Sequence, residues 1–447
     1  MVKTNILIIA LAILCYGCKP ELVSTTPEAG EIDASHFICI GGNEMAGYTN
    51  GALFYDGQQQ SLAKLLSKQL KLVSIANEGF DFHQPLMSQN SVGVSLDSLS
   101  RLILGEKTDC LNNTSLSPIR IAATGDFMAF NESNIGATLH AYQNWGIPGL
   151  KTTDVNTINW SNPFFRRMTS ATGNSILDEI EMAANNNLSF FAVYLGVEDV
   201  LQYAKNGATL PLMTPTNVNG APGIDFQNSL AVMLSVLTSN GAKGVISTIP
   251  DITAFPYFTA IPPNGLTLDS ANLETLNSVY NPIGFSFELG ANNFMINDPA
   301  ANAFGVRPML ENERLLLSVP LDSVKCNKMG SVFPLRDEFV LTVNEIEEIQ
   351  NRINEYNAVI RTLSEQYDLA LVDAHKWFAE IPNEITYNGT PVNSSFASGG
   401  AFSLDGITLT GKGKAMLANE FIKAINLKYH STIPEINALE YNAVLFP

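Results

Sequence analysis

The sequence predicts an α/β fold in which a parallel β-sheet is covered by helices on both faces. Three observations lead to this prediction. Short apolar runs rich in Ile, Val and Phe alternate with longer stretches of helical periodicity, which is typical of βαβ units. The apolar runs are nearly continuous, as strands buried on both faces require. Apolar residues in the longer stretches recur at steps of three and four, so one face of each helix is expected to be buried.

Four apolar runs are the expected strands, and they cover residues 36–40, 189–195, 244–249 and 369–372. The clearest helix is expected over residues 343–367, where Thr342 and Glu345 stand in the spacing of a capping box. A second helix is expected over residues 58–70. A third is expected near the C-terminus, with one buried side that carries Leu417, Phe421 and Ile425.

The N-terminus has the features of a lipoprotein signal peptide over residues 1–17. A single Lys precedes an apolar run at residues 6–14, which is too short to cross a bilayer. The small residue directly before Cys18 resembles a lipobox, so we expect acyl chains such as palmitate on Cys18 to anchor the protein. Residues 18–35 are polar and aperiodic at their start and are expected to form a flexible tether. An ordinary secretory signal is the alternative.

The composition limits the classes of partner and the domain organisation. The formal net charge of −18 argues against nucleic acid and anionic lipid headgroups as partners. We expect one domain over residues 36–430, with irregular insertions at about 81–167 and 251–341, and a C-terminal tail over 431–447. Cys39 is expected to be a buried apolar residue. Cys110 and Cys326 can pair only if they lie close together, which the sequence does not decide.

Several sequence blocks, in a fixed order, resemble one known family. The first is GGNEMAGYTNGAL at residues 41–53, and the others are QPLM at 84–87, LGVEDVL at 195–201, NGAKGV at 240–245, GGAFSLDG at 399–406 and ANEFIKAIN at 418–426. Together they resemble the SGNH/GDSL hydrolases, in particular a lipoprotein branch of Gram-negative bacteria that reads GNSLTAGYxDGAL. The resemblance covers residues 36 to 430. It implies the flavodoxin-like three-layer sandwich of that family, with a parallel sheet and inserted accessory segments.

The resemblance also implies which positions would carry catalysis. The family uses a Ser after the first strand, a His near the C-terminus and an Asp three residues before that His, together with Gly and Asn donors for the oxyanion. The alignment places Asn43 at the nucleophile position, Thr408 at the position of the His and Glu198 at the position of the oxyanion-binding Asn. Asp405 is retained, and Gly79 aligns with the donor Gly.

These replacements remove three separate requirements of the reaction. Asn43 has no ionisable hydroxyl, and Thr408 cannot accept a proton as His does. An ionised Glu198 would repel the negative charge that the oxyanion hole stabilises. We therefore expect a catalytically inactive protein, a pseudoenzyme. No Walker loop, HExxH or CxxC pattern occurs in the sequence, so we expect neither a cofactor nor a metal.

Other interpretations of the polar residues stay open. A shifted register would make Ser35 or Thr49 the nucleophile. The five histidines are expected to be structural or solvated, and they are His36, His83, His140, His375 and His430. Four carboxylates could converge as an acid/base pair or a cation site, and they are Glu44, Glu198, Asp199 and Asp405. The simpler interpretation gives the two Asp residues structural hydrogen bonds and places both Glu residues in solvent at the rim.

The function expected from this combination is binding. We expect a binding or scaffolding subunit of an outer-membrane or cell-surface complex for uptake, secretion or barrel assembly. Its partners would be outer-membrane proteins, a barrel or the lipoproteins associated with it. The alternatives are a lipoprotein that binds carbohydrate or acyl ester, and an esterase or glycan hydrolase with a carboxylate-based site. The aromatic segment 255–258, followed by Pro262 and Pro263, is either an exposed binding surface or a flap on its own core.

Overall fold

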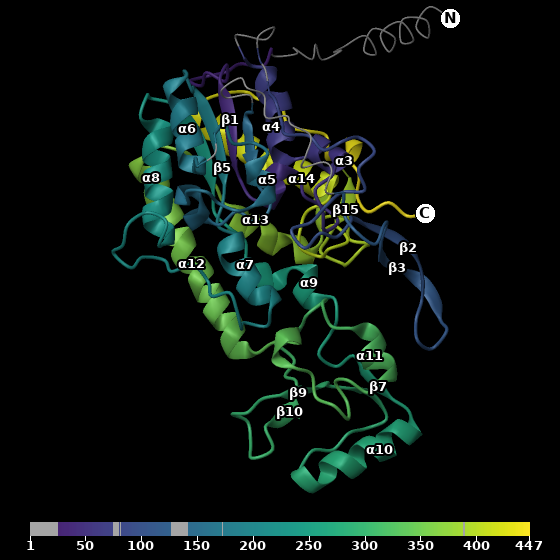
Figure 1. Ribbon diagram of the computed structural model, residues 1–447. Helices are drawn as coiled ribbons and strands as arrows, with labels where there is room; N and C mark the ends of the chain where they lie inside the picture. The colour runs from purple at the N-terminus through teal and green to yellow at the C-terminus, as the bar shows by residue number, and fades with distance from the viewer. Residues whose placement is uncertain (1–25, 75–79, 81, 127–141, 172, 388) are drawn as a thin grey trace, which may run out of the picture.

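A five-stranded parallel sheet forms the centre of the protein (Figure 1). The computed structural model describes residues 26–74, 80, 82–126, 142–171, 173–387 and 389–447. The strands in spatial order are β4 (Asn144–Gly146), β1 (Phe37–Gly41), β5 (Phe190–Tyr194), β6 (Lys243–Ser247) and β13 (Ala370–Val372). Numbered along the chain, this order is 2-1-3-4-5, which is one of the two common orders of doubly wound sheets.

The four strands expected from the sequence are confirmed, and β4 was missed. Every residue of β1 and β5 is buried, as expected for strands covered on both faces. Cys39 lies in the middle of β1 and is fully buried, as predicted. The short β4 contains the polar Asn144 and only three residues, so it carries no apolar pattern that would mark it as a strand.

Helices cover both faces of the sheet, as Figure 1 shows. One layer contains α4 (Leu62–Lys71) and α14 (Gly411–Tyr429), which pack on each other. The other layer contains α6 (Ile176–Asn185), α8 (Phe226–Thr238) and α12 (Val343–Gln366). The fold is therefore α/β with the sheet between two layers of helices, as the sequence predicted.

The expected helices are present, and one of them is divided. In α12 the Glu345 carboxylate accepts the Thr342 N–H at 2.7 Å, as the capping box predicted. The helix expected over 58–70 is instead two helices, α3 (Tyr55–Gln59) and α4. The chain restarts at Ser61, whose Oγ accepts the Lys64 N–H at 3.0 Å and caps α4.

Shorter elements complete the body. The helices are α2 (Asn43–Ala46), α5 (Pro163–Arg166), α7 (Glu198–Lys205), α9 (Pro256–Thr259) and α13 (Ala374–Glu380). The strand pair β14 (Ile385–Tyr387) with β15 (Thr390–Val392) also belongs to the body. The pair β11 (Arg314–Leu315) with β12 (Val340–Leu341) joins the body to the lobe described next, and contributes Leu315 and Val340 to the hydrophobic cluster of that lobe. Within the described ranges, none of the helices is both long enough and apolar enough to span a bilayer.

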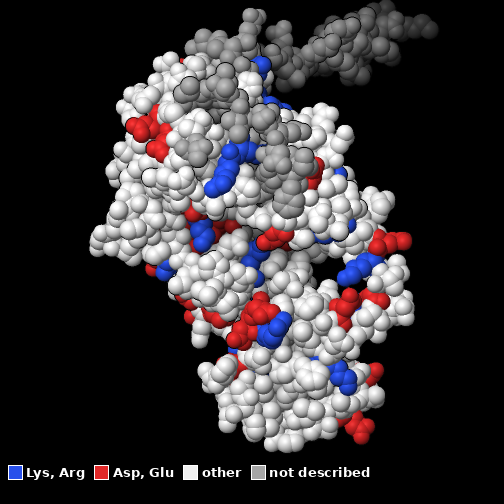
Figure 2. Space-filling model, in the orientation of Figure 1, with Lys and Arg blue, Asp and Glu red and all other residues white. Residues whose placement is uncertain are grey.

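Residues 251–341 contain a lobe with a hydrophobic cluster of its own. The cluster includes Phe294, Met295 and Leu335. Figure 2 shows that uncharged residues make up most of the lobe surface on the face drawn there. The elements of the lobe are β7 (Leu266–Leu268), α10 (Ser270–Tyr280), β8 (Gly290–Asn292), β9 (Met295–Asn297), β10 (Val306–Pro308) and α11 (Leu321–Cys326).

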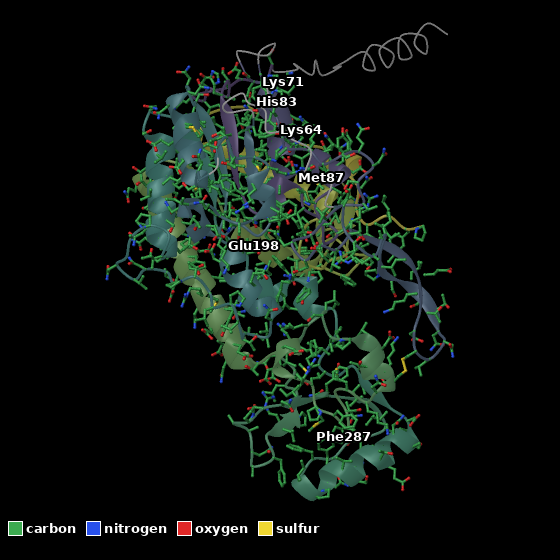
Figure 3. All side chains as sticks on the ribbon, viewed as in Figure 1. Lys64, Lys71, His83, Met87, Glu198 and Phe287 are labelled. Atoms are coloured by element: carbon green, nitrogen blue, oxygen red, sulfur yellow. A yellow bond between two sulfur atoms is a disulfide. The ribbon has the colours of Figure 1, made fainter. Side chains whose placement is uncertain are left out.

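A two-stranded hairpin projects from the body and is joined to the lobe. Its strands are β2 (Leu102–Thr108) and β3 (Thr114–Arg120). A disulfide links Cys110 at its tip to Cys326 in α11, and its yellow bond is visible in Figure 3. The sequence had left this pairing open.

Both ends of the described chain pack on the body. Although residues 18–35 were expected to form a flexible tether, Ile32 and Ala34 are buried and the Glu31 N–H donates to the Tyr429 carbonyl at 2.8 Å. In the C-terminal tail, Ile433 is buried as well. These apolar residues are buried against the body. The local sequence shows that they are apolar but not that a partner surface is present for them.

Candidate functional site

A small pocket lies where the carboxyl ends of β1 and β5 lead into α2 and α7. It has a volume of about 30 Å³. Asn43, Glu198 and Thr408 all line it, although they come from three distant blocks of the sequence. The other lining residues are Gly42, Glu44, Leu150, Tyr194, Leu195, Gly196, Val197, Phe255, Phe378 and Ile407. We call this space the β1/β5 pocket.

Asn43 and Glu198 bond to each other across the β1/β5 pocket. The Asn43 Nδ2 donates to Glu198 Oε1 at 2.5 Å, and Gln202 Nε2 donates to Glu198 Oε2 at 3.1 Å. Burial raises the pKa of Glu198, whose residue is only 3% exposed. The expectation that Glu198 is solvated at the rim is therefore wrong. The amides of Asn43 and Gln202 take the place of water around its carboxyl.

Thr408 and Asp405 form a closed hydrogen-bonding unit. Thr408 Oγ1 donates to Asp405 Oδ2 at 2.6 Å, and the Gly51 N–H donates to the same oxygen at 2.8 Å. Asp405 Oδ1 accepts the N–H groups of Ile407 and Thr408, each at 2.8 Å. The carboxylate thus holds its own loop and the start of the chain after α2. An arrangement of this kind orients a loop, and it contains no imidazole.

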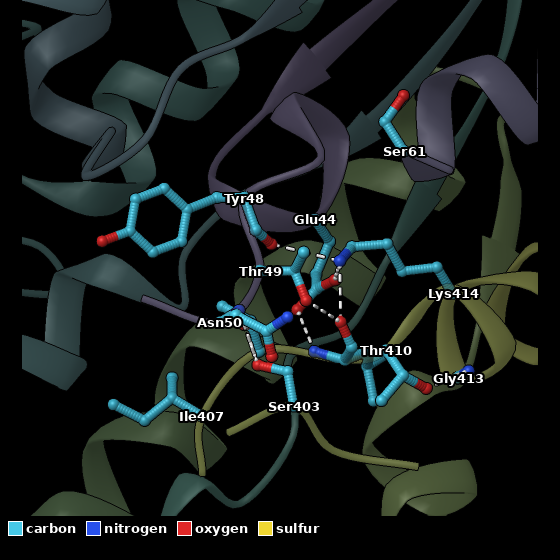
Figure 4. A network of polar contacts seen from close by, with 12 residues as sticks. Glu44, Tyr48, Thr49, Asn50, Ser61, Ser403, Ile407, Thr410, Gly413 and Lys414 are labelled. Carbon is cyan, nitrogen blue, oxygen red and sulfur yellow. Dashed lines mark hydrogen bonds and ion pairs between the residues drawn. The ribbon is translucent and has the colours of Figure 1, made fainter. Parts of the chain in front are cut away.

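Glu44 and Lys414 form a buried pair beside the β1/β5 pocket (Figure 4). Glu44 Oε1 accepts the Leu409 N–H at 2.9 Å, and Glu44 Oε2 lies 3.5 Å from Lys414 Nζ. Lys414 also donates to the carbonyls of Leu409 at 2.7 Å and Tyr48 at 3.1 Å. Burial raises the pKa of Glu44 to about 7 and lowers the pKa of Lys414. The expectation that Glu44 is solvated is wrong.

Sequence reasoning missed Lys414 altogether. It precedes Leu417 by three residues and Phe421 by seven, which places a cation on the buried side of α14. A Lys on a buried face needs polar partners. The position of this Lys in the sequence could therefore have predicted a buried ion pair.

The four carboxylates do not converge on one site. Glu44 and Glu198 line the β1/β5 pocket, whereas Asp199 and Asp405 are not among its lining residues. Asp199 Oδ2 accepts both the N–H and the hydroxyl of Thr152 at 2.9 Å, and burial raises its pKa to about 6. In the described part of the chain, no three His, Cys, Asp or Glu residues are placed to hold a metal ion.

The aromatic segment 255–258 packs on the body, so the hypothesis of an exposed binding surface is wrong. Phe255 is 4% exposed and Phe258 is fully buried. The ring centroid of Phe255 lies 5.5 Å from that of Phe378 and 5.0 Å from that of Phe402. Phe255 and Phe378 also line the β1/β5 pocket, so this aromatic cluster shields the Asn43–Glu198 contact from water.

The remaining candidate residues lie outside the pocket lining. Ser35 precedes β1, and Thr49 Oγ1 donates to the Leu409 carbonyl at 3.0 Å. The ring Nδ1 of His375 is 3.1 Å from the Ile249 carbonyl, which is a structural contact. None of the histidines in the described ranges lines the pocket. Three residues named by the sequence lie outside those ranges, and they are Cys18, Gly79 and His140.

Membership of the SGNH/GDSL hydrolases is a proposal, and it rests on the sequence motifs and on the residues that line the β1/β5 pocket. Comparisons with family models, with curated proteins and with solved structures find no match for this chain.

Proposed function

We propose that this protein is an SGNH-hydrolase-like lipoprotein without hydrolase activity, and that it acts as a binding or scaffolding subunit of an outer-membrane protein complex. Two observations support the family. The sheet order 2-1-3-4-5 with helices on both faces is compatible with a three-layer sandwich. Asn43, Glu198 and Thr408 were aligned with catalytic positions from the motifs alone, and all three line one pocket.

The hydrogen bond between Asn43 and Glu198 is the main observation that supports the proposed absence of catalysis. In the proposed alignment, Asn43 takes the position of the nucleophile and Glu198 that of an oxyanion donor, and the two side chains bond to each other. The two groups satisfy each other inside a shielded pocket, so neither is free to act on a carbonyl carbon. Thr408 is likewise engaged by Asp405.

The pocket volume argues against a small molecule bound in the β1/β5 pocket. Ligand pockets usually enclose about 300–1,000 Å³, whereas the β1/β5 pocket encloses about 30 Å³. A sugar or an acyl ester does not fit there without movement of the aromatic cluster. Binding of carbohydrate or acyl ester in this pocket is therefore the weaker alternative.

A hydrolase with a carboxylate-based site is the second candidate, because one observation favours it. Glu44 and Glu198 both line the pocket, and burial raises the pKa of both. A carboxyl group that keeps its proton near neutral pH can act as a general acid. Under this alternative the protein would hydrolyse an ester, and Glu198→Gln would abolish the hydrolysis.

The proposed anchor places the complex at the outer membrane, on its periplasmic face or at the cell surface. The test is purification of the full-length lipoprotein in detergent from its native membrane. We expect an outer-membrane protein to be recovered with it in a constant ratio, while recovery of the lipoprotein alone would contradict the proposal. Palmitate labelling should be lost in Cys18→Ala and kept in the matched variant Cys15→Ala, and a labelled Cys18→Ala protein would exclude the anchor.

A further inference from the structure

A hollow larger than the β1/β5 pocket lies at the base of the hairpin. It has a volume of about 480 Å³, within the range of ligand sites. Its walls include the first three residues of strand β2, Leu102 to Leu104, residues between Phe54 and Gln60, and the last residues of the chain, 442–447. Figure 1 shows the C-terminal tail leaving the body beside the hairpin. We call this hollow the hairpin groove.

Strand β2 presents an unpaired edge to the hairpin groove. The Leu102 N–H donates to the Asn50 carbonyl at 2.8 Å, so it points away from β3. Backbone groups alternate in direction along a strand, and the N–H and C=O of Leu104 and Glu106 therefore also point away from β3. Within the described residues no hydrogen bond reaches these groups. Leu104 lines the groove and is itself buried.

The two edges of the hairpin differ, because a proline interrupts the outer edge of β3 and none interrupts that of β2. Pro118 lies opposite Leu104 in β3, at a position that faces away from β2. Proline has no N–H group, and natural sheets use it to block pairing at an exposed edge. The sequence of β2, Leu102–Thr108, contains no proline.

The hairpin is held in place at both ends, so its open edge is preorganised. At the base, Arg120 Nη1 donates to the carbonyls of Gly51 and Ser100. At the tip, the Cys110–Cys326 disulfide and the ion pair of Lys325 with Asp109 at 2.8 Å join it to α11. An isolated two-stranded hairpin is barely stable in water. A clamped one offers its edge without an ordering cost on binding.

We infer that the hairpin groove binds an extended polypeptide segment of a partner protein, which adds as a strand to the β2 edge. The free backbone N–H and C=O groups of Leu104, in the groove, and of Glu106, just beyond its lining, select another extended backbone. The apolar wall, which includes Phe54, Leu104 and Leu404, selects apolar side chains at alternate positions of that segment. This inference rests on the proposed binding function and gives the partner a docking place.

The probe is a set of ten-residue peptides, selected from a random phage-displayed library on the full-length protein. Each selected peptide is labelled, and its Kd is measured by fluorescence anisotropy. We expect peptides with alternating apolar residues, and we expect Glu106→Pro to weaken binding by more than tenfold. Glu106→Ala removes the same exposed side chain but keeps the N–H, so it should bind the peptide as the wild type does.

Two further measurements guard against a misfolded variant. Amide exchange of the wild-type protein should show new protection at Leu104 and Glu106 when the peptide is bound. Removal of residues 443–447, which line the groove, should weaken binding at least threefold. Selected peptides that bind Glu106→Pro as tightly as wild type, or protect another region, would overturn the inference, and so would a selection that yields no binding peptide. An esterase assay is independent of all these outcomes.

Discussion

Replacing Glu44 with Gln should reduce the pH dependence of stability between pH 5 and 8. The Glu44 carboxyl is buried beside Lys414, and burial raises its pKa from 4.5 to about 7. Between these two values the folded protein holds the proton more tightly than the unfolded chain does. The free energy of unfolding therefore falls as the pH rises through this window.

The size of the effect follows from the two pKa values. The difference, 7 − 4.5, is about 2.5 units, and at about 1.4 kcal/mol per unit it corresponds to about 3 kcal/mol. Asp199, whose pKa burial raises from 3.8 to about 6, acts in the same direction and is unchanged by the substitution. Because part of this change lies below pH 5, the wild type should lose about 2–3 kcal/mol more than Glu44→Gln between pH 5 and 8.

Urea unfolding at pH 5, 6, 7 and 8, followed by circular dichroism, measures this difference. Glu44→Gln also leaves Lys414 without its carboxylate, so the variant should be less stable than wild type at pH 8. The test depends only on how steeply the free energy of unfolding changes with pH, and not on its absolute value. Glu181→Gln, at an exposed position of α6, is the matched control and should keep the wild-type slope. An unchanged slope in Glu44→Gln would refute the burial argument.

Two other substitutions test the packing around the pocket. Asn43→Asp puts a second carboxylate 2.5 Å from Glu198 Oε1, so it should lower the free energy of unfolding by about 2–3 kcal/mol at pH 8 and by less at pH 5, in the same urea assay. An equal loss at both pH values would exclude charge repulsion. Phe258→Ala should cost about 3–5 kcal/mol, because this side chain is fully buried. Phe304→Ala, at a position 62% exposed, should cost less than about 0.5 kcal/mol, and similar losses in both would contradict the flap assignment.

Most of the sheet could be predicted because its strands are buried on both faces. That burial demands apolar side chains at successive positions, and the runs containing Phe37–Gly41 and Phe190–Tyr194 show this pattern. The strand Asn144–Gly146 could not be found in the same way. Its Asn144 is buried through hydrogen bonds to the Met45 carbonyl and Gln84 Oε1, which are distant in sequence.

The motifs predicted that three distant residues lie together, but they did not predict the environment of these residues. The alignment brought Asn43, Glu198 and Thr408 to one place, and all three line the β1/β5 pocket. The sequence predicted solvated Glu side chains because carboxylates are seldom buried without partners. The partners are Asn43 for Glu198 and the Leu409 N–H for Glu44, and both depend on tertiary contacts. The same limit applied to residues 255–258, whose aromatic rings suit an interface as well as a core.

We propose that this protein has the place for a hydrolase site but no hydrolase activity. The most direct measurement is turnover of p-nitrophenyl acetate by the purified wild-type protein, against a heat-treated sample. The variant that combines Asn43→Ser, Glu198→Asn and Thr408→His serves as the comparison. We expect no turnover by the wild type and measurable turnover by the triple variant. Turnover by the wild type that is lost in Glu198→Gln would contradict the claim and assign the chemistry to the buried carboxyl.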